Sequence, residues 1–598
     1  MEARSSGDPA AIGQASAKVI ALALAEMAKL RLDDKAYEEA IKLCGESLKF
    51  EDTAETRVEI AIASLYAKKL PEAVRQASSA TELDPQNTLA WTIKGEALLR
   101  TKSYAEAVSA LRQAIELKSD AEALYALGVA QLGLGDKEAA AERFSQFLNL
   151  VGDYGWSRVL IGRAYQGQLQ LSEAETEFRT AVRLDPRTPN AHYFWALILL
   201  KENEWSPTPE VFSHLQNELR LNPRHFEANY MLGSLASHAR NYKESDQYLL
   251  LASEVKPSVP ETWVLLGLNA QNHRTNRVAE SYFRKAIELA KDLDFKEHLE
   301  VRKAYIGLGR ILVSSGRTRE GEELLNKARE LQAQSLAERQ KSLTTENGRQ
   351  DERETMGGAT PYLPETDSDH RPYLSPPSAL GSITKEGPSS STRAAGSSSS
   401  DPDGKIARHL GAVLGSSFND LATAEALQQK YDLAAKHYRE AAKWDAQIPG
   451  LQRNQGLAAY FVGDHAEAIR LLAKVVREAP DDAYARAVLG LAYFATQKFA
   501  MAMQTISPIA ERAAQDPQLG LAWATSLAKT GNKIGAVRAL ERLEHANPSM
   551  SVENLIQSGR LWMDLGKTER AAEFFRRALV IDPENADAKC ALGLSKCP

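Results

Sequence analysis

The chain has 598 residues, of which 43% are hydrophobic and 25% charged, and its formal net charge at pH 7 is −6. These values are ordinary for a globular protein of several domains, and the small negative charge gives no reason to expect nucleic acid or an anionic membrane surface as a partner. The three cysteines are too few, and odd in number, for a disulfide framework.

The N-terminal segment does not have the pattern of a signal peptide. Its start is acidic and contains proline, and its apolar part is interrupted by Lys18 and Glu26. No apolar run reaches the roughly 18 residues that span a membrane. We therefore expect a tail and lead-in over residues 1–20, an amphipathic helix after it, no direct membrane insertion, and cytoplasmic residence by default. A leader upstream of Met1 would instead indicate the periplasm or the cell envelope.

A pattern with a period of about 34 residues runs through most of the chain. Its copy near the C-terminus consists of Gly559, Ala571, Phe575, Ala578 and Pro583. The apolar spacing predicts two helices of about 13 residues, joined by a short turn, with the proline ending the second helix. Small residues are expected where the two helices cross, because they let the backbones approach closely. The small residues predicted at these crossings are Gly95, Ala107, Gly162, Ala174, Gly233, Gly267, Ala279, Gly309, Gly456, Ala468, Gly490, Ala502, Gly559 and Ala571.

The copies fall into two arrays. We expect about nine units over residues 21–336, and about five units plus a capping helix over residues 404–598. The unit near residue 189 has two prolines in a longer turn, and an insertion before residue 302 should lengthen a helix. Residues 337–403 are rich in Ser, Pro, Gly and charge, so they are predicted to form a disordered linker.

This pattern resembles the tetratricopeptide repeat (TPR). One of the most similar copies contains Trp263, Leu266, Gly267, Ala279 and Phe283 at the family's spacing. The resemblance implies an all-α fold, an α–α superhelix or TPR solenoid, here in two arrays joined by the linker. It also implies that each unit contacts only its neighbours and that the first helix of every unit lines a concave groove.

Four successive units place aromatic residues or Arg at the positions that the resemblance assigns to the groove. Residues of these types anchor many protein interfaces. They can contact a partner, or they can pack between helices, because one of these positions is often half-buried. The candidate groove residues are Tyr125, Trp156, Val159, Arg163, Tyr193, Phe194, Tyr230 and Met231.

The sequence contains no HExxH, GxxxxGK[ST], GxSxG or CxxC motif, and its eleven histidines are scattered. We therefore expect no enzymatic activity, no cofactor and no metal site. The leading hypothesis is a non-catalytic scaffold or adaptor that binds proteins or peptides in the grooves. Two alternatives are an exported assembly factor of the bacterial cell envelope and the regulatory TPR portion of a larger enzyme such as a glycosyltransferase. Self-association stays open.

Overall fold

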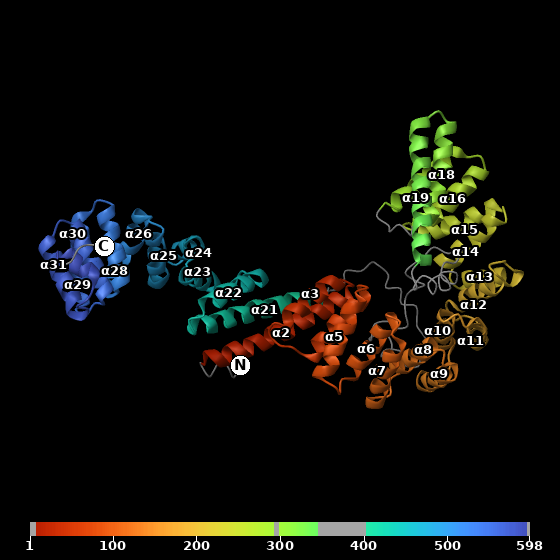
Figure 1. The fold of residues 1–598 in the computed structure, drawn as a ribbon, viewed down its shortest axis with the longest axis horizontal. Helices are drawn as coiled ribbons and strands as arrows, with labels where there is room; N and C mark the ends of the chain where they lie inside the picture. The colour runs from red at the N-terminus through yellow and green to blue at the C-terminus, as the bar shows by residue number, and fades with distance from the viewer. Residues whose placement is uncertain (1–7, 292–297, 345–401, 595–598) are drawn as a thin grey trace. The chain divides into compact units, whose positions relative to one another are not determined.

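The computed structural model describes residues 8–291, 298–344 and 402–594, and every regular element within them is a helix. The helices follow one another as pairs joined by short turns (Figure 1). The all-α solenoid fold expected from the sequence is therefore confirmed for the described residues.

The chain divides into two compact units. Unit 1 combines residues 1–69 with residues 395–598, and unit 2 comprises residues 70–394. The helices of unit 1 are α2 (Pro9–Asp33), α3 (Tyr37–Ser47), α4 (Ala54–Tyr66), α21 (Pro402–Leu427), α22 (Tyr431–Trp444), α23 (Leu451–Phe461), α24 (His465–Glu478), α25 (Ala483–Ala495), α26 (Phe499–Ile506), the 3-10 helix η2 (Ser507–Ile509), α27 (Ala510–Gln515), α28 (Pro517–Lys529), α29 (Lys533–Ala546), α30 (Val552–Asp564), α31 (Thr568–Ile581) and α32 (Ala586–Ala591).

Unit 2 begins with α5, a second helix of the repeat, and continues from α6 as helix pairs. Its helices are α5 (Leu70–Leu83), α6 (Thr88–Arg100), α7 (Tyr104–Leu117), α8 (Ala121–Gly133), α9 (Lys137–Val151), α10 (Gly155–Gly167), α11 (Leu171–Leu184), α12 (Ala191–Glu202), α13 (Pro209–Leu221), α14 (Phe226–His238), α15 (Tyr242–Val255), α16 (Pro260–Asn272), α17 (Asn276–Leu289), α18 (His298–Ser314) and α19 (Thr318–Thr344).

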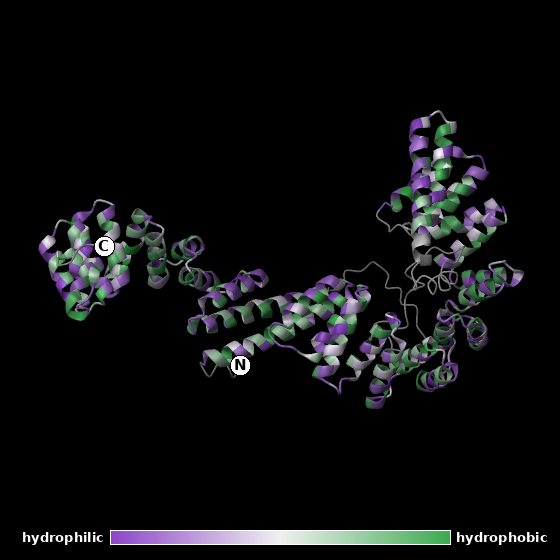
Figure 2. Ribbon diagram, in the orientation of Figure 1, coloured by the Kyte–Doolittle hydropathy of each residue, from purple (hydrophilic) through white to green (hydrophobic). Residues whose placement is uncertain are grey.

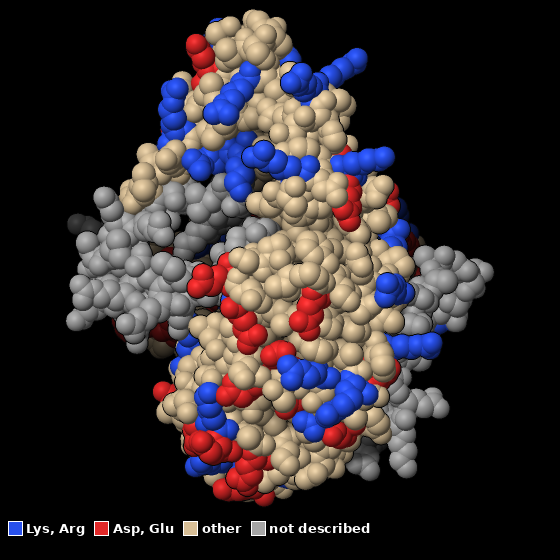
Figure 3. All heavy atoms as spheres, turned by 90° about the vertical axis from the view of Figure 1, so that its right-hand side faces the viewer, with Lys and Arg blue, Asp and Glu red and all other residues tan. Residues whose placement is uncertain are grey.

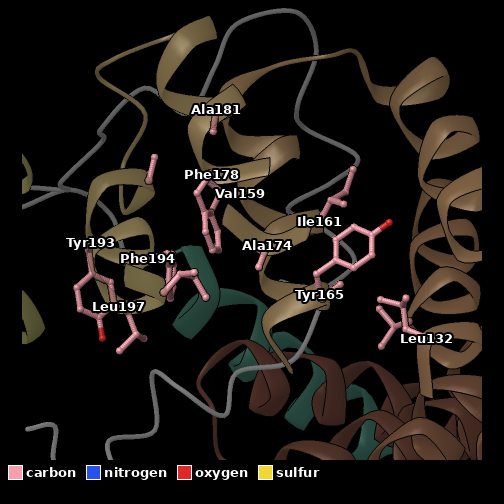
Figure 4. Packing of buried hydrophobic residues seen from close by; sticks show 14 of the residues in the cluster. Leu132, Val159, Ile161, Tyr165, Ala174, Phe178, Ala181, Tyr193, Phe194 and Leu197 are labelled. Atoms are coloured by element: carbon pink, nitrogen blue, oxygen red, sulfur yellow. The ribbon is translucent and has the colours of Figure 1, made fainter. Parts of the chain in front are cut away.

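Close helix crossings explain the glycines of the repeat. A Cβ atom at Gly162 would lie 2.6 Å from Phe178 Cε1, and one at Gly559 would lie 2.8 Å from Phe575 Cε1. No side chain fits there, so tight packing offsets the roughly 1 kcal/mol that a helical glycine costs relative to alanine. Figure 4 shows Phe178 among the buried side chains of this crossing. The same close approach occurs at Gly95, Gly233, Gly267, Gly309, Gly456 and Gly490, and the six alanines predicted at crossings are buried.

The two helices of a pair differ in how much of their surface is buried. Helix α8, a first helix, has ten buried residues, whereas α11, a second helix, has only Ala174, Phe178 and Ala181. The first helix of a pair packs against other helices on several sides. The second helix has an apolar stripe that faces the core and charged side chains that face solvent. Figure 2 shows hydrophilic (purple) and hydrophobic (green) residues on the same helices.

Three pairs depart from the regular pattern. The turn before α13 contains Pro207, and the second proline predicted for that turn, Pro209, is the first residue of the helix. Helix α18 has 17 residues, against 13 for α16. Helix α26 ends after eight residues, and η2 follows it, because Pro508 has no backbone N–H to continue the helix. This last break was not predicted from the sequence.

The first helix belongs with the C-terminal part of the chain, which differs from the predicted division into arrays at 21–336 and 404–598. One core cluster of unit 1 contains Ile20 and Leu24 of α2 together with Leu414 and Phe418 of α21, all of them buried. Each helix presents an apolar face to the other in this cluster. Packing these two faces on each other removes both from water.

Helices α2 and α21 are equivalent in register. Ile20 and Leu24 correspond to Leu414 and Phe418 at a constant separation of 394 residues (414 − 20 and 418 − 24). The turn after each helix has a residue of positive φ at the same separation, Lys35 at 60° and Gln429 at 61°. The two helices therefore use the same face to meet each other.

Helix α2 is also long and apolar enough to cross a membrane by length and composition alone, with a mean hydropathy of 1.3 over 18 residues. The prediction that no apolar run reaches the length of a membrane span is therefore wrong for this helix by that test, in spite of Lys18 and Glu26. In the structure, Ile20, Leu24 and neighbouring residues of the helix pack in the protein core. Of the predicted linker at 337–403, residues 337–344 belong to α19, 402–403 belong to α21, and the rest lies outside the described residues.

Candidate partner-binding surface

Most of the predicted groove residues lie in the core of unit 2. Tyr125, Tyr193 and Met231 are at most 2% exposed. Six of the eight are buried, namely Tyr125, Val159, Tyr193, Phe194, Tyr230 and Met231, whereas Trp156 and Arg163 are half-buried. These six residues therefore pack between helices, as the alternative interpretation expected, and a contact of any of them with a partner stays a prediction.

Tyr125 illustrates why these residues are buried. Its ring centroid lies 5.9 Å from that of Phe144 and 5.5 Å from that of Phe147. Its hydroxyl donates a hydrogen bond of 2.9 Å to the carbonyl oxygen of Leu160 in α10. The side chain thus joins the first helix of one unit to the first helix of the next, so its ring is not available to a partner.

Arg163 and Phe194 form a second contact between neighbouring units. The Arg163 guanidinium lies 5.0 Å from the centre of the Phe194 ring, within the range of a cation–π interaction. The Phe194 ring also stacks on the ring of Phe178, and the two ring centroids are 5.6 Å apart. In Figure 4, Phe178, Val159 and Phe194 lie close together between the helices.

The accessible remainder of the predicted set lies on α10. Trp156 and Arg163 are seven residues apart and therefore share one face of the helix. Tyr154, just before the helix, is 48% exposed, and its ring is stacked on that of Trp156 at 6.4 Å and 18°. We call Tyr154, Trp156 and Arg163 the α10 surface. Sequence reasoning missed Tyr154 because it precedes the helix and has no groove position in the repeat.

A buried histidine pair lies beside this region, in the irregular unit of α12 and α13. His192 Nδ1 and His214 Nδ1 are 2.9 Å apart, so one ring donates a hydrogen bond to the other. Both residues are buried. Burial lowers the pKa of His192 and lowers that of His214 to about 4, with the His192 ring as a further cause for His214. Both rings are therefore neutral at pH 7, and they join the two helices.

Buried polar groups also hold the start of α12. The Glu218 carboxylate, which is 1% exposed, accepts hydrogen bonds from the backbone N–H groups of Asn190 and Tyr193 at 2.9 and 3.3 Å. His225 Nε2 lies 2.7 Å from Asn190 Oδ1, and burial lowers the pKa of this histidine. The carboxylate satisfies N–H groups that a helix start leaves unpaired. These polar groups are therefore structural.

A second set of titratable groups lies between α6 and α8. Glu96 is buried and forms an ion pair of 2.5 Å with Arg100. Burial, with smaller contributions from Asp120 and Glu96, raises the pKa of Glu122 to about 7. Within the described ranges, no group of three or more His, Cys, Asp or Glu residues could hold a metal ion.

Comparison with known proteins agrees with the helix-pair architecture. Two family models described as tetratricopeptide repeats match the chain. One matches residues 462–524, and the other matches residues 58–122, 104–148, 159–206 and 521–586. These matches fall in both units.

Among curated proteins, the chain is similar to cellulose synthase operon protein C of Pseudomonas fluorescens (strain SBW25). The two are 28% identical over 184 residues, which covers 28% of this chain and 14% of the relative. This chain therefore spans only a small part of that protein's length.

Among solved structures, the chain is similar to the C-terminal part of a TPR repeat-containing protein of Cytophaga hutchinsonii. The identity is 14% and the TM-score 0.32, with 43% of this chain and 98% of that one covered. It is also similar to a thermophilic TPR protein of Thermus thermophilus, at 18% identity and a TM-score of 0.26, with 30% and 99% covered. Because these TM-scores are low, the solved structures do not carry the family assignment. The assignment depends on the family models and on the geometry of the helix pairs. On those two grounds, the chain is a tetratricopeptide repeat protein.

Proposed function

We propose that this protein is a non-catalytic scaffold that binds protein or peptide partners on the surfaces of its TPR helices. The observation that carries the proposal is the architecture itself, because the described helices form repeat pairs in both units. Solenoids of stacked repeats offer extended surfaces of the kind used for partner binding. Ion pairing accounts for Glu96, capping for Glu218, and packing for the pair of His192 and His214.

The α10 surface is the proposed contact site in unit 2. It combines an exposed tyrosine, a half-buried tryptophan and an arginine, and such residues dominate the binding energy of many interfaces. The stacking of Tyr154 on Trp156 and the position of Arg163 over Phe194 orient the three side chains before a partner arrives. Less side-chain entropy is then lost on binding.

Affinity capture with the full chain tests the proposal. Tagged protein is incubated with lysate of the native organism, and retained proteins are compared with those on Tyr154→Ala/Trp156→Ala. A matched control is Tyr484→Ala in unit 1, where the ring is 39% exposed and flanked by Arg453 and Arg512.

We expect the wild-type chain and the control to retain specific proteins that the double variant does not retain. The helicity of the double variant, measured by circular dichroism, should equal that of the wild-type chain. Loss in the control alone would place the contact in unit 1. If the full chain retains no protein above the level of an unrelated bait, the scaffold proposal is wrong.

A second candidate function is association with the cell envelope or with a polysaccharide synthase. The similarity to cellulose synthase operon protein C supports it, over 14% of that protein. Fractionation of the native organism, with antibody detection of this chain, tests the idea. Recovery with the envelope fraction would support it, whereas recovery only with the cytosol would contradict it.

A further inference from the structure

Three consecutive turns of unit 2 carry basic residues at equivalent positions. The turns joining α14 to α15, α16 to α17 and α18 to α19 place Lys243, Arg277 and Arg319 at the second residue of the following helix. Further basic residues lie in the turns themselves. We call Arg240, Lys243, Arg274, Arg277, Arg317 and Arg319 the basic edge, and all six are exposed.

The three turns are neighbours in space. The Tyr242 ring at the start of α15 lies 5.8 Å from the ring of His273 in the next turn, in an edge-on arrangement. Glu280 of α17 forms an ion pair with Arg317 in the third turn. In Figure 3, Lys and Arg gather on the upper part of the face that is shown, at the height of α16, α18 and α19 in Figure 1.

Arg317 and Arg319 form ion pairs with Glu280 and Glu323, which favour folding. Other features of the basic edge do not favour folding. Lys243, Arg277 and Arg319 lie in the first turn of a helix, where the helix dipole favours acidic residues. Lys243 follows Arg240 by three residues, and Arg277 follows Arg274 by three, so that like charges are close together. In addition, Arg240 and Arg274 form no ion pair with any described residue, so no carboxylate of that part of the chain offsets their charge.

Backbone conformation is a further cost at two of these positions. Arg240 and Arg274 have φ angles of 61° and 58°, in the left-handed region. This region costs a residue with a Cβ atom roughly 1 kcal/mol or more. The equivalent position holds glycine in some turns, as at Gly135, and a non-glycine residue in others, as at Lys35 and Lys102. The left-handed backbone is thus a general property of these repeat turns, and the row of exposed basic side chains is the feature that carries the inference.

We propose that the basic edge binds an acidic segment of a partner protein. Arginine side chains can hold separate carboxylates through paired hydrogen bonds, and three adjacent turns offer several of them in a row. Half-buried acidic residues, among them Glu244, Glu280 and Glu320, lie between the basic ones, which disfavours the continuous charge of a nucleic acid. The inference depends on the proposed scaffold function and specifies a second contact surface, separate from the α10 surface.

Fluorescence anisotropy on the full chain tests the inference. The probe is a fluorescein-labelled ten-residue peptide of alternating Glu and Gly, with a Gln–Gly peptide and a ten-nucleotide single-stranded DNA as comparison probes. The test variant is Lys243→Glu/Arg277→Glu/Arg319→Glu. The charge-matched control is Arg112→Glu/Lys118→Glu/Arg187→Glu, at exposed positions in the same unit. The test substitutions place acidic residues at helix starts, which favours folding.

We expect the Glu peptide to bind the wild-type chain and the control with Kd values within twofold of each other. The test variant should bind at least tenfold more weakly, and binding should weaken from 50 to 150 mM salt. Equal losses in both variants, equal binding of the Gln peptide, or no binding of the Glu peptide would overturn the inference. Tighter binding of the DNA that depends on the same three residues would also overturn it. If lysate partners are lost from the α10 variant while the Glu peptide fails to bind, only this inference is wrong.

Discussion

A designed disulfide between α2 and α21 tests the assignment of the first helix to unit 1. A Cβ atom at Gly13 would lie 3.6 Å from the Cβ atom of Ala424, within the 3.5–4.5 Å range of natural disulfides. The pair Gly13→Cys/Ala424→Cys should therefore form a disulfide under mild oxidation. In all samples Cys590 and Cys597 are replaced by serine, and Cys44 is kept because it is fully buried.

The size of the closed loop sets the expected stabilisation. The bond would join positions separated by 411 residues (424 − 13), and the chain-entropy relation gives about 6 kcal/mol against complete unfolding for such a loop. Engineered bonds deliver less than this relation gives, so a gain of about 2–4 kcal/mol is the realistic outcome. Urea unfolding with and without reductant measures it.

The crosslink itself is detected first, as a faster band on a non-reducing gel that disappears on reduction. The single variants Gly13→Cys and Ala424→Cys, mixed in equal amounts, provide the control for exchange between chains. A crosslinked dimer in that mixture would show that α2 of one copy can occupy α21 of another. Failure of the double variant to form the intramolecular bond would refute the packing of α2 on α21.

Three other predictions concern packing, pH and the turns. Gly559→Leu should destabilise the last helix pairs by a few kcal/mol, because the added side chain overlaps Phe575; hydrogen exchange should show lost protection in α30 and α31 and unchanged protection in unit 2. Since the folded pKa of His214 is about 4, against about 6.5 when unfolded, stability should be fully present above pH 6.5. The free energy of unfolding should fall by up to about 3 kcal/mol toward pH 4. His214→Gln should flatten this dependence in thermal melts, and an unchanged pH dependence in the variant would contradict the role of His214. Lys102→Gly should raise the melting temperature, with about 1 kcal/mol gained, because the φ angle of Lys102 is 60°; a lower melting temperature would contradict the strain argument.

The fold could be predicted from the sequence because the repeat constrains it locally. Each crossing needs a small residue opposite a large one sixteen positions later, as at Gly162 and Phe178, and the chain repeats that requirement many times. The break after α26 could not be read from the same pattern, since Pro508 lies within a segment that otherwise matches a second helix.

The site could be predicted only in part. Groove positions in the repeat specify which helix face a residue occupies, but they do not specify how closely the next unit covers it. Tyr125 is covered because its hydroxyl reaches Leu160 of the next first helix, whereas Trp156 stays half-buried. The pairing of α2 with α21 depends on a contact between segments far apart in sequence, which a period of 34 residues does not reveal.

The pairing of α2 with α21 has a consequence for synthesis of the chain on the ribosome. Asp33 and Pro402, the last residue of one helix and the first of the other, are separated by 368 residues (402 − 33 − 1). At about 5–20 residues per second, roughly 20–70 seconds pass between their emergence. During that interval Ile20 and Leu24 lack the partner helix that buries them. Nascent chains should therefore engage holdase chaperones through α2 and release them once α21 has been made.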